Sequence, residues 1–220
     1  MDAALSYADE HFDTFVDQLE ALLAIPSVST DSAYADEVQR AAQWVAEHLR
    51  ERGVQHAEVA ETEGHPVVYA EHITGDDKPT VLVYGHYDVQ PPDPLDEWDT
   101  PPFEPTQQNG TLYARGACDD KGQMFMHLKA LESYLESGAE PPVNLKFVIE
   151  GEEEIGSEHL APFLREHQDR LDADVVLISD TSMFSEEVPS ITYGLRGLAY
   201  AEVTLQGPNR DLHSGVYGGA

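Results

Sequence analysis

The chain has 220 residues, of which 42 are acidic and 12 are basic, so its formal net charge is −30. This charge argues against binding to nucleic acid or to an anionic membrane surface, because both present phosphate groups. The single cysteine, Cys118, excludes an internal disulfide framework and a cysteine-rich zinc ribbon.

Helical and strand-like patterns alternate along most of the chain. Predicted helices cover residues 6–24, 33–52, 122–137 and 157–171, and predicted strands cover residues 67–73, 80–84, 145–150 and 174–179. Such alternation is typical of an α/β protein, so we expect a largely parallel sheet flanked by helices. Between these elements, residues 89–109 hold six prolines and are predicted to form a long loop.

After Asp180 the alternation of helical and strand-like patterns gives way to strand-like segments separated by glycines. Residues 191–193 and 198–205 are strand-like and are punctuated by glycines. We place a domain boundary near residue 187, with one domain over 1–187 and a second α+β domain beginning at 188. About 33 residues are too few for an independent core, so we expect the second domain to be incomplete over 188–220.

No apolar run approaches the roughly 18 residues that a membrane span needs. The first residues, MDAALSYADEHFD, show neither the basic start nor the apolar stretch of a secretory signal. We therefore expect a cytoplasmic protein. The excess of acidic residues suggests a second hypothesis, adaptation to high salt, because self-repulsion destabilises a compact chain until salt screens it. The alternative is an acidic protein without salt adaptation.

Acidic and histidine side chains follow the predicted strands at their carboxyl ends, where open α/β sheets bind ligands. The residues are His86 and Asp88, Asp119 and Asp120, Glu152, Glu153 and Glu154, and Asp180. Carboxylates gathered in one place repel each other, and a divalent cation removes that repulsion. The pattern therefore predicts a metal site, and the number of carboxylates suggests two ions that share a ligand.

Each of these clusters also has a structural explanation when it is taken alone. Any one acid could be a solvated surface charge, and His86 could be an ordinary buried histidine. The three glutamates could begin a helix, and Asp180 could cap one. Their coincidence at strand ends favours the metal site. Other chemistries have no motif here: the sequence lacks a nucleophile elbow, a Walker loop and an H-E-x-x-H pair.

Five segments resemble, in order, the motifs of one metallohydrolase family. They are GHYDVQP (85–91), YARGACDDKG (113–122), EGEEEIGSE (150–158), ISD (178–180) and DLHSGVYGG (211–219). The family contains two-metal aminoacylases, carnosine dipeptidases and succinyl-diaminopimelate desuccinylases. The last motif and the aromatic and proline-rich loop around residues 98–103 look closest to the carnosine dipeptidase branch.

The resemblance implies a set of metal ligands. His86 and Asp180 would bind the first ion, Asp119 would bridge the two ions, and Glu154 would bind the second. The ions would most readily be zinc, with manganese and cobalt as alternatives, since imidazole and carboxylate ligands suit all three. Family members supply a further histidine to the second metal, and no residue in 1–220 occupies that place.

The resemblance also implies catalytic roles and a reaction. Asp88 would orient His86, and Glu153, rather than Glu152, would be the general base toward a water activated by the two metals. His213 would reach from the second, lid domain into the partner subunit of a homodimer and help to hold the substrate's oxyanion. The implied reaction is hydrolysis of a peptide or N-acyl amide bond in a small substrate, such as a dipeptide or an acylated amino acid.

Three hypotheses follow for the chain itself. It could be the amino-terminal part of a two-metal peptidase, a truncated metal-binding or interaction protein without catalysis, or a charged scaffold that binds no metal. Metal analysis separates the third from the others, and turnover of dipeptides separates the first two.

Overall fold

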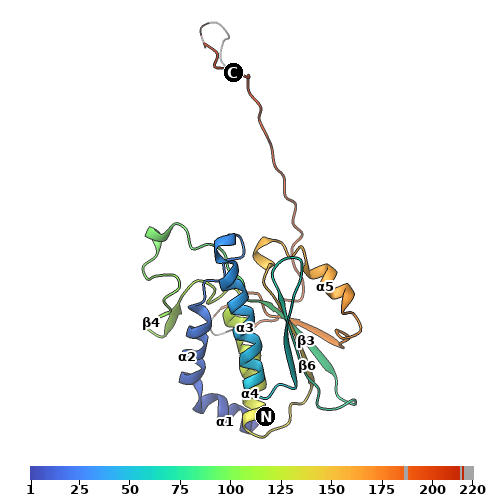
Figure 1. Ribbon diagram of the computed structural model, residues 1–220. Helices are drawn as coiled ribbons and strands as arrows, with labels where there is room; N and C mark the ends of the chain where they lie inside the picture. Colours follow the sequence, from blue (N-terminus) through green and yellow to red (C-terminus); the bar gives the residue numbers. More distant parts are fainter. Residues whose placement is uncertain (186–187, 214, 216–220) are drawn as a thin grey trace. The chain divides into compact units, whose positions relative to one another are not determined.

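The computed structural model describes residues 1–185, 188–213 and 215 (Figure 1). Contacts within the chain divide it into two units, Met1–Thr181 and Ser182–Ala220. The division lies close to the boundary predicted near residue 187. Within the described ranges, none of the helices combines the length and the apolar character needed to cross a bilayer.

A five-stranded mixed sheet forms the centre of the first unit. Its strands, in spatial order, are β1 (His56–Ala60), β2 (Val67–His72), β6 (Asn144–Glu150), β3 (Thr80–His86) and β7 (Val175–Ile178). The pairs β6–β3 and β3–β7 are parallel, whereas β1–β2 and β2–β6 are antiparallel. The predicted sheet flanked by helices is confirmed, but it is mixed rather than largely parallel, because β1 and β2 pair antiparallel. Its parallel part consists of β6, β3 and β7, whose carboxyl ends lead to His86, Glu153 and Asp180.

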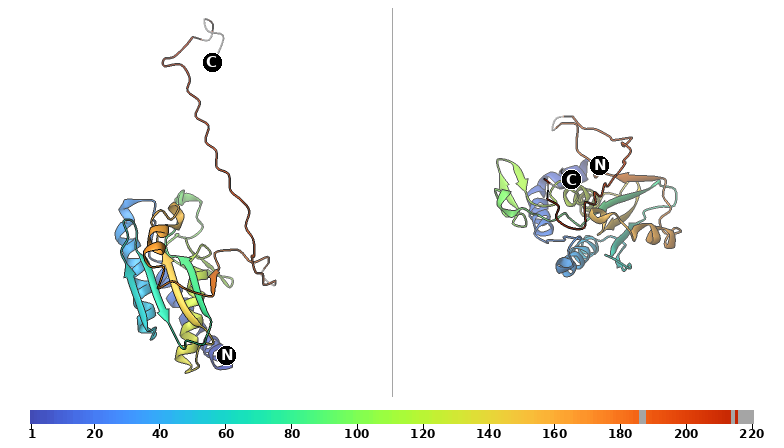
Figure 2. Two further views of the ribbon diagram at one scale, coloured as in Figure 1. Left: turned by 90° about the vertical axis from the view of Figure 1, so that its right-hand side faces the viewer. Right: turned by 90° about the horizontal axis from the view of Figure 1, so that it is seen from above.

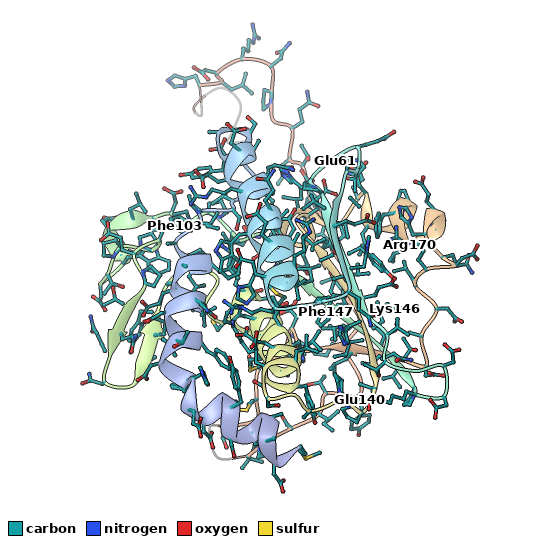
Figure 3. All side chains as sticks on the ribbon, turned by 60° about the horizontal axis from the view of Figure 1, so that its bottom comes forward. Glu61, Phe103, Glu140, Lys146, Phe147 and Arg170 are labelled. Atoms are coloured by element: carbon teal, nitrogen blue, oxygen red, sulfur yellow. The ribbon has the colours of Figure 1, made fainter. Side chains whose placement is uncertain are left out.

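Helices cover both faces of this sheet (Figure 2). The helices are α1 (Asp2–Glu10), α2 (Phe12–Leu23), α3 (Ala35–Glu51), α4 (Lys121–Glu136) and α5 (Leu160–Glu166). Successive residues of β6 point to opposite faces, as the pleat requires. Phe147 packs with the core on the side of α3 and α4, whereas its neighbour Val148 packs with Phe163 of α5. Figure 3 shows Phe147 between the helices and the strands.

The predicted helix over residues 6–24 is two helices that meet at His11. The backbone NH of His11 and its ring Nδ1 both approach the carbonyl of Tyr7, the ring at 2.8 Å. The imidazole also stacks on the Tyr7 ring, with 3.9 Å between the centroids. A side chain that competes for a helix carbonyl favours a helix end, so α1 stops and α2 starts anew. Hydrophobic periodicity alone could not reveal this break.

The proline-rich segment contains a hairpin as well as a loop. Strands β4 (Thr106–Gln108) and β5 (Thr111–Tyr113) pair antiparallel around Asn109 and Gly110, which both have positive φ angles. An Asn-Gly pair with positive φ at both positions is the preferred two-residue hairpin turn. The predicted loop therefore ends near residue 105, and the hairpin lies between the loop and the segment that leads to Asp119.

The second unit contains little regular structure among its described residues. Ser185 and Val188 form an isolated bridge, and the backbone NH of Phe184 donates to Ser190 Oγ at 3.1 Å. The strands predicted at 191–193 and 198–205 are not formed. A strand needs a hydrogen-bonding neighbour, and the described part of this unit provides none for them. Of the predicted second domain, residues 214 and 216–220 lie outside the described residues.

A buried polar network ties α2, α3 and α4 together. The ammonium group of Lys129 donates to His48 Nε2 at 2.8 Å, to Glu132 Oε2 at 2.6 Å and to the Gln18 side chain. Arg52 lies 3.6 Å from the other oxygen of Glu132. Because Lys129 donates to its Nε2, His48 must be neutral in this arrangement. Burial, with help from the charges of Lys129 and Arg52, lowers the pKa of His48, although Glu132 acts in the opposite direction.

This network predicts a stability that declines in acid. An unfolded histidine titrates near pH 6.5, and the folded pKa of His48 is lower. The stability that neutral His48 contributes is therefore complete above about pH 6.5 and is lost as the pH falls through the folded pKa. The free energy of unfolding, measured by urea denaturation from about pH 8 to about pH 5, should fall more steeply for the parent than for His48→Gln.

The matched control is His56→Gln, which changes a partly exposed histidine on β1. It should follow the pH profile of the parent. Parallel profiles for the parent and His48→Gln would contradict the role of His48.

Candidate metal centre

His86 is the last residue of β3 and is completely buried. Its ring Nδ1 donates to the backbone carbonyl of Asp88 at 3.0 Å, which leaves Nε2 directed away from β3. Three carboxylates face that nitrogen: Asp119 Oδ1 at 3.1 Å, Asp180 Oδ2 at 3.7 Å and Glu153 Oε2 at 3.9 Å. The structure thus brings together residues from the ends of β3, β6 and β7 and from the turn before α4.

The carboxylate of Asp88 contacts His86 and the backbone of two glutamates and so fixes their positions. It is fully buried, and its Oδ2 accepts a 2.6 Å hydrogen bond from Ser29 Oγ. The backbone NH groups of Glu153 and Glu154 donate to its two oxygens at 3.2 and 3.1 Å. Its Oδ1 also lies 3.3 Å from the Nδ1 of His86. Asp88 therefore fixes both the imidazole and the two glutamates.

Asp119 and Asp120 take different positions although they are neighbours joined by a cis peptide bond. Asp119 is exposed beside His86 Nε2, whereas Asp120 is buried and accepts from the backbone NH of His86 at 3.2 Å. The next residue, Lys121, is buried and donates to the carbonyls of Leu22 and Ile25 at 3.1 and 2.7 Å. Its ammonium thus pins the start of α4 to the end of α2 and sets the position of the Asp pair.

The three consecutive glutamates also differ. Glu152 is buried and accepts from the backbone NH of His65 and of His159, at 3.0 and 3.1 Å, so it is occupied away from His86. Glu153 faces His86, and Glu154 accepts from the side-chain amide of Gln90 at 2.8 Å. Of the three, only Glu153 is placed beside His86, and the roles of Glu153 and Glu154 stay predictions.

The electrostatics of the site favour added positive charge. Burial, followed by the neighbouring acids, raises the pKa values of Glu153, Glu154 and Asp180 above their ordinary range. Burial also raises the pKa of Asp120 to about 7. Burial disfavours a charged His86, but the surrounding carboxylates, Asp88 first, outweigh it and raise the pKa of this imidazole to about 10.

A divalent cation fits this set of donors. One donor atom each from His86, Asp119 and Asp180 lies within 4.8 Å of the others. Among the described residues, neither aspartate forms an ion pair with a Lys or Arg side chain. Imidazole nitrogen with carboxylate oxygens suits zinc, manganese and related ions. Nδ1 of His86 already donates to a backbone carbonyl, which leaves Nε2 available as a ligand. The predicted metal site therefore has a structural basis in these three residues.

Sequence patterns missed several groups that support the site. Ser29 and Gln90 contact the predicted residues directly, yet neither was assigned a role in advance. Asp120 was counted among the clustered acids, and it contacts the backbone NH of His86 rather than the ring Nε2. Ser29 lies far away in the sequence, and only the parallel bridge between Val28 and Val89 brings it to Asp88.

His213 belongs to the second unit, where its Nδ1 accepts from the backbone NH of Gly215 at 3.0 Å. Its proposed contact with the substrate's oxyanion stays a prediction.

Comparison with known sequences relates the chain to peptidases. Residues 82–210 match the family described as Peptidase family M20/M25/M40. The chain is 38% identical over 231 residues to the Cys-Gly metallodipeptidase dug1 of Schizosaccharomyces pombe, a match that covers 100% of this chain and 48% of that protein. It is 36% identical over 233 residues to the Beta-Ala-His dipeptidase of Homo sapiens, covering 100% of this chain and 46% of that protein. The chain thus spans about half the length of these curated relatives.

Solved structures give the same result. The dipeptidase Dug1p from Saccharomyces cerevisiae is similar with a TM-score of 0.83 and 31% identity, over 99% of this chain and 49% of that one. Human carnosine dipeptidase 1 is similar with a TM-score of 0.76 and 34% identity, over 82% of this chain and 41% of that one.

If Asp119 is a metal ligand, its loss should weaken zinc binding without unfolding the protein, because its side chain is exposed. Asp119→Asn should lower zinc affinity by at least the 10- to 100-fold that is typical when a supporting group at a metal site is removed. Isothermal titration with zinc and metal analysis after dialysis measure this change, and circular dichroism reports the fold. Asp13→Asn, at an exposed acid on α2, is the control and should bind zinc as the parent does. Equal zinc affinity in Asp119→Asn would remove Asp119 from the ligand set.

Proposed function

Because this chain belongs to peptidase family M20/M25/M40, we propose that it carries the metal-binding and catalytic residues of a metal-dependent dipeptidase. The observation that carries the proposal is the convergence of Asp119, Asp180 and Glu153 on the Nε2 of His86. The similarity to metallodipeptidases along the whole chain supports the same reaction class.

We propose that two divalent ions occupy the site, most readily zinc. His86 and Asp180 would hold one ion, Glu154 the other, and Asp119 would be shared between them. Divalent cations at such a site polarise a substrate carbonyl and activate water for attack on it. Manganese and cobalt suit the same ligands.

Glu153 is proposed as the general base. The carboxylate of Glu153 lies near His86 Nε2, among the proposed ligands. Asp88 accepts a hydrogen bond from the backbone NH of Glu153 and leaves its carboxylate available for proton transfer. Burial raises its pKa, which brings the carboxylate closer to the value that suits proton transfer near neutral pH. Glu153 would take the proton from the attacking water and pass it to the leaving amine. Asp88 would act as a positioning residue, because it contacts His86 and the glutamate backbone.

Dipeptides are the proposed substrates. The names of the relatives specify Cys-Gly and Beta-Ala-His as dipeptides that those proteins cleave. N-acyl amino acids are a related class with the same scissile amide bond. We further propose that the protein acts as a homodimer in which His213 completes the partner's site, as the resemblance of its motif implies.

The role of the general base is tested with Glu153→Gln. Loss of a general acid–base group typically lowers turnover by about 10²- to 10⁴-fold, and we expect a decrease of this size. Hydrolysis of Cys-Gly and of Beta-Ala-His is followed after loading with zinc, manganese or cobalt, and the metal content of each variant is measured in parallel.

Glu140→Gln is the matched control, because Glu140 lies on the surface and pairs with Lys78. It should retain the activity of the parent. Turnover in Glu153→Gln equal to that of the parent would show that Glu153 is not the base. Bound metal without any turnover in the parent would instead favour the non-catalytic metal-binding hypothesis.

We also propose that the protein is adapted to high salt. In the described part of the chain, Lys or Arg side chains pair with only four acids: Glu37, Glu58, Glu132 and Glu140. Most of the 42 acids therefore repel each other without compensation. Raising KCl from about 0.1 M to about 1 M shortens the screening length from about 10 Å to about 3 Å. The Tm should rise over this range, and an unchanged Tm in calorimetry would contradict salt adaptation. Sucrose at equal osmolarity serves as the uncharged control.

A further inference from the structure

A pocket of about 650 Å³ lies between the proline-rich loop, strand β5 and the segment that follows β5. Its walls include Asp93, Glu97, Trp98, Asp99, Tyr113 and Cys118. We call it the Trp98 pocket. Its volume falls within the range of about 300–1,000 Å³ that is usual for small-molecule sites.

The two chain segments that line the Trp98 pocket are continuous in sequence with residues at the candidate metal centre. On one side, Gln90 donates to the carboxylate of Glu154 at 2.8 Å, and the chain continues from there to Asp93. On the other side, Cys118 immediately precedes Asp119, which faces His86. Because consecutive Cα atoms are about 3.8 Å apart, the Cys118 end of the pocket lies close to the Asp119 end of the candidate metal centre.

The aromatic wall of the pocket is fixed in orientation. The indole Nε1 of Trp98 donates to the carbonyl of Pro92 at 2.7 Å. The guanidinium of Arg115 lies 5.2 Å from the centroid of the Trp98 ring and donates to the carbonyl of Pro91 at 3.1 Å. Arg115 therefore braces the ring and the loop together. Arg115 already takes the cation–π position on this indole, so the ring offers a ligand mainly its remaining apolar surface.

The carboxylates of the pocket lack cationic partners. Asp93, Glu97 and Asp99 are exposed, and none forms an ion pair with a Lys or Arg side chain among residues 1–185, 188–213 and 215. Three negative charges beside an indole favour a ligand that combines an aliphatic stem with a positive end. An acidic ligand would be repelled, and a neutral apolar one would leave the charges uncompensated.

We propose that the Trp98 pocket is the subsite that receives a cationic side chain, such as that of lysine or arginine, of a dipeptide substrate. This inference rests on the proposed dipeptidase function for the identity of the substrate. The stem would lie against Trp98, and the charged end would lie among Glu97, Asp99 and Asp93. The pocket thereby makes the enzyme prefer basic over neutral and acidic dipeptides.

A binding experiment tests the pocket without using catalysis. Lysine amide and norleucine amide have side chains of similar length, and only the former ends in an ammonium group. The zinc-loaded full chain is titrated with each at one KCl concentration, by calorimetry and by tryptophan fluorescence. We expect lysine amide to bind about fivefold to tenfold more tightly, and Glu97→Gln/Asp99→Asn to remove the difference.

Two controls separate the pocket from general charge. Glu10→Gln/Asp13→Asn changes the net charge by the same amount at exposed acids on α1 and at the start of α2, and should keep the preference. The chain has two tryptophans, and the other, Trp44, stacks on His48 and packs, partly buried, against the core. The fluorescence response should therefore disappear in Trp98→Phe. Equal affinity for the two amides in the parent, or a preference that survives Glu97→Gln/Asp99→Asn, would overturn the proposal.

Hydrolysis of Gly-Lys and Lys-Gly against Gly-Met and Met-Gly then separates the two proposals. Cleavage of all four without preference would overturn the subsite and leave the dipeptidase function standing. Preferential binding of lysine amide without cleavage of any dipeptide would support the pocket and contradict the function.

Discussion

The candidate metal centre depends on the hydrogen bonds that the buried carboxylate of Asp88 accepts. This carboxylate accepts hydrogen bonds from Ser29 Oγ and from the backbone of Glu153 and Glu154, and it lies beside the Nδ1 of His86. These partners come from the loop after α2, the turn after β6 and the end of β3. Leaving one of these buried donors without a partner would cost about 1–3 kcal/mol of folding stability, and this cost favours the observed geometry. One carboxylate thus aligns an imidazole and two further carboxylates that repel each other.

That repulsion links the stability of the fold to the metal. Burial and neighbouring charge raise the pKa values of Glu153, Glu154 and Asp180, so their ionised forms are less favourable in the folded chain than in the unfolded one. A ligand that binds only the folded state stabilises it in proportion to its affinity and concentration. A divalent cation at His86 and Asp119 would therefore act on both the chemistry and the fold.

Sequence patterns predicted which side chains meet at the candidate metal centre because these residues follow a rule of topology. Parallel strands present their carboxyl ends at one edge, so His86 and Asp180 were predicted to meet, and they do. The same rule could not choose among three consecutive glutamates, since their orientation depends on which of them His65 and His159 capture. It could not find Ser29 either, because that contact is made through a bridge between segments sixty residues apart. The break at His11 was hidden for a local reason, competition of one imidazole for one carbonyl.

The negative charge of the chain and the Trp98 pocket both affect how the protein would select cationic ligands. A strongly negative surface attracts cations of every kind, including metal ions and basic peptides, and this raises their rate of encounter. In concentrated salt such attraction is screened within a few ångströms, so distant carboxylates cannot distinguish one substrate from another. Only groups that touch the ligand retain their effect. In such a medium, selectivity for a basic side chain must come from short-range contacts of the kind that the rigid indole of Trp98 and the adjacent carboxylates of Glu97 and Asp99 provide.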